Sequence, residues 1–157
     1  LLNVSGNTSE DLLRRIKPEM EARIKDGIKG AVISIGIVDA GVSSHEKPVS
    51  ISQYRKNIGA ILDIAKKYSK IIVVPGLTRV NHALPQPFSP EGKKIYSNDR
   101  IKVFDSELEK QCYSRDVVYI PLSQVLKKED LKDGIHPNDK GHHKIFHRIY
   151  SNNFQLC

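Results

Sequence analysis

Apolar residues along the chain form two kinds of segment, short continuous runs and longer stretches with helical spacing. The continuous runs cover residues 30–38, 71–74 and 117–120, and residues 1–4 resemble the tail of a further strand. Runs rich in β-branched residues without polar alternation are typical of parallel strands that are buried on both faces. We therefore predict these segments as the strands of a parallel sheet.

The first helical segment follows a turn cluster at residues 5–9, where Thr8 or Ser9 can cap a helix. Pro18 lacks a backbone N–H, so the helix is expected to end or kink there. A second short helical piece, closed by Gly27, is then expected before the next strand.

Three further helices are predicted from apolar residues that recur with a helical period. Ser50 or Ser52 caps the first of these, a short helical segment is expected over residues 122–127, and the last helix ends near Tyr150. The apolar positions of the three helices are Ile51, Tyr54, Ile58, Ile61, Leu62, Ala65 and Tyr68; Ile95, Ile101, Phe104, Leu108 and Cys112; and Ile145, Phe146, Ile149 and Tyr150.

This alternation of strands and helices predicts an α/β fold with helices on both faces of a parallel sheet. The chain of 157 residues suits one domain, and no internal repeat divides it. In such sheets ligands bind at the carboxyl ends of the strands. Gly6, Asp39, the proline-rich loop over residues 77–92 and the loop at Asp133 all follow strands or lie on that rim, so one crevice can gather them.

The net charge of +7 raises the question of a nucleic-acid partner. The basic residues are scattered in pairs, and no recognition motif or aromatic stacking pattern accompanies them. We therefore expect a solvated basic surface and no nucleic-acid binding, although a basic module for an anionic partner stays open.

Two cysteines, Cys112 and Cys157, form neither a metal-binding set nor a disulfide framework. Cys112 lies on a helical apolar stripe and is expected in the core. The sequence contains no apolar run long enough to span a membrane and no signal-peptide pattern, so a reducing, cytoplasmic compartment is the default expectation. The sequence leaves the oligomeric state open.

Asp133 and His136 form the chemically most informative motif, three residues apart and just before Pro137. Proline is favoured at the first position of a helix, so the motif is expected in a loop that opens the last helix. A carboxylate in that position can bind one imidazole nitrogen and leave the other free as a general base. The alternative is a glycine-containing turn with a solvated histidine.

Several blocks of the sequence together resemble the SGNH hydrolases, the GDSL-type esterases and lipases. Residues 3–13 resemble the second conserved block of that family, residues 36–39 lie where it carries Gly-x-Asn-Asp, and residues 133–142 resemble its last block. Residues 98–101, at the start of a predicted helix, also suit the family. The resemblance spans essentially the whole chain.

The resemblance implies a flavodoxin-like three-layer fold with strand order 2-1-3-4-5, and hydrolysis of small-molecule esters through Ser, His and Asp. By resemblance, His136 is the general base, Asp133 orients it, and the backbone N–H of Gly6 donates to the oxyanion. Asp39 and His82 are weaker candidates for substrate contact, since Asp39 can instead bind turn backbone and His82 can simply be exposed. No metal or organic cofactor is implied.

Two departures from the family pattern qualify this interpretation. No Gly-Asp-Ser occurs in the sequence, and Val38, which cannot donate, stands at the position of the oxyanion-hole asparagine. None of Ser5, Ser43 and Ser44 is expected as the nucleophile. In strand order 2-1-3-4-5 the strand that carries Gly-Asp-Ser is central, so we expect an incomplete domain that lacks about thirty residues for one strand and its crossover.

The sequence thus predicts an SGNH-type ester hydrolase domain whose serine lies outside it. The alternative is a catalytically inactive relative that binds a ligand or partner at the same crevice.

Overall fold

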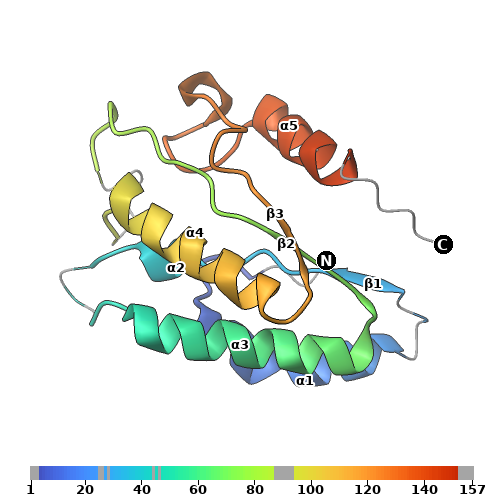
Figure 1. Ribbon diagram of the computed structural model, residues 1–157. Coiled ribbons are helices and arrows are strands. Elements are labelled where there is room, and N and C mark those ends of the chain that lie inside the picture. Colours follow the sequence, from blue (N-terminus) through green and yellow to red (C-terminus); the bar gives the residue numbers. More distant parts are fainter. Residues whose placement is uncertain are drawn as a thin grey trace.

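The computed structural model describes residues 4–24, 27, 29–43, 45, 47–86 and 94–151. Helices and strands alternate along this part of the chain (Figure 1). In order, the elements are α1 (Ser9–Ile24), β1 (Gly30–Val32), α2 (Ile37–Ala40), α3 (Ile51–Tyr68), β2 (Ile71–Pro75), α4 (Asn98–Tyr113), β3 (Val118–Ile120), the 3-10 helix η1 (Lys128–Asp130) and α5 (Asp139–Tyr150).

The described strands form one parallel sheet with the order β1-β2-β3. Val73 is the centre of a row across it, pairing with Val32 on one side and Val118 on the other. Strands that follow one another along the chain are therefore neighbours in this parallel sheet. This confirms the predicted α/β class and agrees with the last three positions of the order 2-1-3-4-5. The strand expected over residues 1–4 lies almost entirely outside the described residues.

Alternate residues of β2 face two different layers of helices. Ile72 and Val74 belong to the main core, which α1, α3 and α4 cover, while Val73 belongs to a smaller cluster against which Ile145 and Ile149 of α5 pack. Figure 1 shows the same division, with α1, α3 and α4 on one side of the strands and α5 on the other. The period of two in a strand thus produces the three-layer arrangement.

Helix α1 continues through Pro18, so the helix does not end there, and the expected second helical piece is the second half of α1. Ile16 and Met20 on either side of the proline are buried in the core. Arg15 also forms an ion pair with Glu19 across the same turn, at 2.5 Å. Packing of this apolar face stabilises the helix despite the missing backbone hydrogen bond, because tertiary contacts routinely outweigh local propensity.

The predicted strand over residues 30–38 is too long. Pairing ends at Val32, apart from one further hydrogen bond from the Ile33 amide to the Val73 carbonyl at 2.8 Å, and Ile37–Ala40 forms the short helix α2. Gly36 causes the change of direction, since its φ of +122° is a conformation that other residues rarely adopt.

Three predicted boundaries also differ from the structure. Ile95 precedes α4 and pairs with Val42 in an isolated bridge, and the segment expected as helix over residues 122–127 is a turn followed by η1. Pro137 does not open α5, because the side chain of Asn138 caps the helix by accepting from the Gly141 amide at 3.0 Å.

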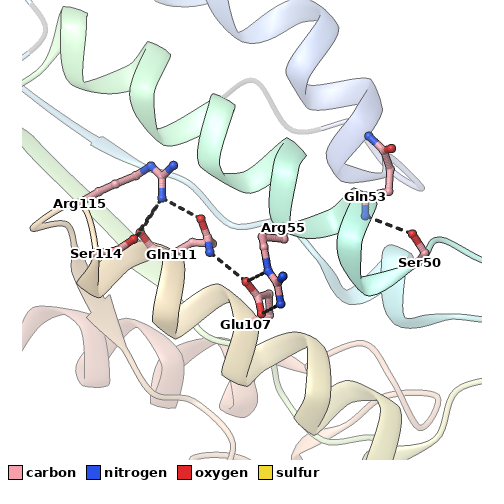
Figure 2. Close-up of polar contacts among 7 residues, drawn as sticks. All are labelled: Ser50, Gln53, Arg55, Glu107, Gln111, Ser114 and Arg115. Carbon is pink, nitrogen blue, oxygen red and sulfur yellow. Dashed lines mark hydrogen bonds and ion pairs between the residues drawn. The ribbon is translucent and has the colours of Figure 1, made fainter.

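The long helix α3 matches its prediction, including the cap from Ser50, whose hydroxyl accepts from the Gln53 amide at 3.1 Å. Polar side chains link its outer surface to α4 (Figure 2). Arg55 of α3 binds Glu107 of α4 at 2.8 Å, and Gln111 donates to the same carboxylate at 2.9 Å. Cys112 on the inner face of α4 is fully buried, as predicted.

Candidate active site

Asp133 and His136 are in direct contact in the loop between η1 and α5. Oδ2 of Asp133 lies 2.7 Å from Nδ1 of His136, while Oδ1 accepts from the backbone amides of Ile135 and His136 at 3.1 and 2.9 Å. The carboxylate therefore binds both the side chain and the backbone of the histidine that it was predicted to orient.

Burial raises the pKa of the Asp133 carboxyl, but the hydrogen bonds from His136 and Ile135 outweigh it and hold the pKa below the ordinary 3.8. At neutral pH the carboxylate is ionised and can only accept, so Nδ1 of His136 carries the proton. Nε2 is then the basic nitrogen, and none of the described residues hydrogen-bonds to it. The His136 side chain is 69% exposed, which leaves Nε2 open to a ligand.

The turn that carries this pair has a defined backbone. Gly134 has a φ of +98°, so glycine is needed between the acid and the base. The amide of Lys132 donates to the His136 carbonyl at 2.7 Å, and Leu131 pairs with Pro137 in an antiparallel bridge. These contacts close the loop on itself before α5 begins.

Gly6 lies in an exposed turn just before α1, with a φ of +76°. A Cβ at this position would meet nothing within 4 Å, so the backbone conformation and not space favours glycine. Its N–H has no acceptor among the described residues. Thr8 ends the turn as the cap of α1, where its hydroxyl and amide both donate to Asp11 at 2.7 and 2.9 Å.

Asp39 is fully buried and binds the first residue of α1. Its Oδ1 accepts from the Ser9 hydroxyl at 2.6 Å, and its Oδ2 accepts from the Ser9 amide at 2.9 Å. Asn57 donates to the same hydroxyl at 3.0 Å, and Gln53 donates to Asn57 at 2.8 Å. Burial raises the pKa of the Asp39 carboxyl above 3.8, an effect that the Ser9 bonds partly offset. This places Asp39 behind the Gly6 turn, away from solvent, which argues against the weak expectation that it contacts substrate.

Val38 lies half-buried in α2, and its carbonyl accepts from Lys94 Nζ at 3.3 Å. Gly36, two residues earlier, packs directly on Tyr54, so a Cβ there would collide with the tyrosine hydroxyl. The segment that corresponds to Gly-x-Asn-Asp is thus firmly placed, but its third side chain is apolar.

His82 lies exposed in the described part of the long loop, where its Nε2 accepts from the Asn98 amide at 3.2 Å. The side chain of Asn98 in turn binds Val80, and the amide of Asn81 donates to the Gly134 carbonyl at 2.8 Å. No functional role for Asn81 or Asn98 is predicted from the sequence. The only signal for such a role was that Asn98 begins residues 98–101, the start of a predicted helix that suits the family.

The predicted site residues form two groups, which are joined internally. One contains Asp39, which binds Ser9, three residues after Gly6 in the chain. The other contains His82 and the Asp133–His136 turn, which are linked through residues 80, 81 and 98. The segments that follow β1, β2 and β3 leave the sheet on the same side, at the left and upper left of Figure 1. A cleft of about 680 Å³ lies elsewhere, along α5, and none of the predicted site residues lines it.

Within the described residues no serine hydrogen-bonds to His136, and no three His, Cys, Asp or Glu side chains gather as a possible metal site. Among the described helices, none has the length and apolar character needed to cross a membrane.

Comparison with known structures places the fold among esterases and acylhydrolases. A lipase/acylhydrolase from Enterococcus faecalis has 21% identity and a TM-score of 0.69, with 94% of this chain and 70% of that chain covered. The acetylxylan esterase Axe2 from Geobacillus stearothermophilus has 18% identity and a TM-score of 0.70, with 97% and 70% covered. A protein from Bacteroides fragilis has 19% identity and a TM-score of 0.75, with 97% and 73% covered.

A comparison with curated protein sequences found no match. The model of the GDSL-like lipase/acylhydrolase family matches residues 1–144, which include every predicted site residue. Together with the three-layer fold and the Asp133–His136 pair, this match shows that the chain belongs to the GDSL-like lipase/acylhydrolase family.

Proposed function

We propose that this domain hydrolyses carboxylic esters of small molecules, with His136 as general base and Asp133 as the group that orients it. The nucleophile is a serine outside the 157 residues of the sequence. The observation that carries the proposal is the 2.7 Å contact between Asp133 Oδ2 and His136 Nδ1, which leaves Nε2 free. Its setting in a member of an acylhydrolase family supports acyl transfer over other uses of such a pair.

In the first half of the reaction the serine oxygen attacks the ester carbonyl while Nε2 of His136 takes the hydroxyl proton. The tetrahedral intermediate collapses, the alkoxide leaves with the proton that His136 returns, and an acyl-serine remains. Water then attacks the acyl-serine with His136 again as base, which releases the carboxylic acid and regenerates the serine. Asp133 stabilises the imidazolium in each half.

The N–H of Gly6 is the proposed donor to the oxyanion. An amide that has no acceptor among the described residues, held in a turn just before a capped helix, is suited to this role. Asp39 is proposed to act indirectly, by fixing the start of α1 behind that turn through Ser9. His82 stays a candidate for substrate contact at the exposed loop.

A second candidate function is ligand binding without catalysis. Val38 supplies no donor where the family has asparagine, and loss of one oxyanion donor typically lowers turnover by about 10²–10³-fold. A relative that has also lost the serine can still bind an ester or a partner at the same place.

The test compares p-nitrophenyl acetate hydrolysis by the longest gene product and by the present chain, each with and without His136→Ala. His142→Ala is the matched control, because His142 is also exposed but lies on α5. Turnover in the longer protein that His136→Ala abolishes and His142→Ala preserves would support the hydrolase.

If neither protein shows His136-dependent turnover, also with butyrate and octanoate esters, the proposal fails. Binding of those esters without turnover would then favour the non-catalytic function.

A further inference from the structure

We infer that Asn98 is a positioning residue for the Asp133–His136 pair, which it controls through the loop that follows β2. Only the consequence of this role for catalysis rests on the proposed function. The contacts themselves concern the geometry of the pair, which can be measured without turnover.

The Asp133–His136 turn has one hydrogen bond to another element among the described residues. That bond joins the Gly134 carbonyl to the Asn81 amide at 2.8 Å, and the other hydrogen bonds of the turn lie within residues 132–136. Gly134 directly follows Asp133 in the chain. The position of the Asn81 amide therefore influences where the carboxylate lies relative to the imidazole.

Asn98 fixes the residue before Asn81. Its Oδ1 accepts from the Val80 amide at 2.9 Å, and its Nδ2 donates to the Val80 carbonyl at 3.1 Å. The side-chain amide thus both accepts and donates, as a neighbouring strand would, and it binds the backbone N–H and C=O of one residue, Val80. Val80 is 5% exposed and packs in the main core, so this anchor point is buried.

Asn98 is itself held in place at the start of a capped helix. Asn98 is the first residue of α4, whose cap Ser97 accepts from the Arg100 amide at 3.2 Å. The backbone amide of Asn98 also donates to Nε2 of His82 at 3.2 Å, which adds a second tie to the same loop. The route from a helix to the catalytic turn is therefore short: Asn98 holds Val80, and Asn81 holds Gly134.

The experiment measures the tautomer of the His136 imidazole by ¹⁵N NMR in the present chain at about pH 8, where an ordinary histidine is neutral. A His136→Gln spectrum assigns the signals. Asn98→Ala is expected to shift the ratio of the Nδ1–H to the Nε2–H tautomer by roughly three- to tenfold toward Nε2–H, the factor that one hydrogen bond of ordinary strength sets in an equilibrium. Hydrogen exchange of the Asn81 amide should accelerate in parallel.

Ser97→Ala is the matched control, because it removes the neighbouring cap of α4 but no contact to Val80. It should lower stability while leaving the tautomer ratio unchanged. Asn98→Asp, which keeps the acceptor for the Val80 amide, provides a second variant if Asn98→Ala does not fold. It loses the bond to the Val80 carbonyl and places an oxygen against it, so a shift toward Nε2–H is expected for it as well.

An unchanged tautomer ratio in Asn98→Ala or, if that variant does not fold, in Asn98→Asp, or an equal shift in Ser97→Ala, would overturn the inference and leave Asn98 as a structural residue only. Absence of ester turnover in the longer gene product would count against the proposed function and would not alter this readout.

Discussion

Asp39 and Ser9 are thirty positions apart in the chain, yet the buried carboxylate of Asp39 accepts from both the amide and the hydroxyl of Ser9. This contact joins the short helix α2 to the first turn of α1. A carboxylate at the amino end of a helix is also favoured by the helix dipole. The turn that presents the Gly6 amide is therefore tied to the segment that carries Val38.

Replacement of Asp39 by Asn should destabilise the domain by about 1–3 kcal/mol, because one of two donors on Ser9 would face an amide NH₂ instead of an oxygen. Urea unfolding at pH 7 measures the effect. Asp63→Asn is the control, at an exposed aspartate of α3 that pairs with Arg115, and it should change the free energy of unfolding by less than about 1 kcal/mol, as is usual for exposed ion pairs. Equal effects of the two substitutions would argue that the Ser9 contact contributes nothing specific.

Gly36→Ala should be strongly destabilising, because alanine would have to adopt a φ of +122° and its Cβ would collide with the hydroxyl of Tyr54. That hydroxyl is buried without a hydrogen-bond partner among the described residues. Tyr54→Phe alone should therefore be neutral or stabilising.

The Gly36→Ala substitution should also cost less in the Tyr54→Phe background than in the native one, and thermal unfolding of the four proteins tests this coupling. Additive effects would show that the collision with the hydroxyl is not the main cause.

Asp133→Asn should lower the kcat of the catalytically competent protein far more than it changes KM. An amide can offer its NH₂ group to the imidazole and so favour the wrong tautomer, and in a serine protease the corresponding change lowers kcat by about 10⁴-fold. Steady-state kinetics with p-nitrophenyl acetate provide the measurement. A change confined to KM would indicate that Asp133 serves binding and not the base.

The contact between Arg55 and Glu107 should stabilise the domain only above the acidic range. Hydrogen bonds from Arg55 lower the pKa of Glu107 below its ordinary 4.5. A carboxyl whose pKa is lower in the folded state stabilises fully above its unfolded pKa and loses this contribution as the pH falls through the folded value.

Glu107→Gln should therefore reduce stability at pH 7 and have a smaller effect at about pH 3, which lies below the pKa of a glutamate in the unfolded chain. Urea unfolding at both pH values tests the sign. A larger effect at the acidic pH would contradict the stated direction of the pKa shift.

Local patterns in the sequence determined much of this protein. The continuous β-branched runs and the apolar spacing of the helices predicted the parallel sheet and its covering layers, because burial on one or two faces imposes those periods directly. The Asp133–His136 contact was also predictable, since three residues of loop keep acid and base within reach whatever the rest of the fold does.

Other features depended on contacts that no local pattern encodes. Pro18 stays inside α1 because Ile16 and Met20 are buried against distant residues. The run over residues 30–38 leaves the sheet after Ile33 and turns at Gly36, where Tyr54 fills the space beside the glycine. Asp39 is a buried partner of Ser9 and Asn98 holds Val80 because folding brings together residues that are 30 and 18 positions apart. Such pairings follow from packing of the whole core, which only the tertiary structure decides.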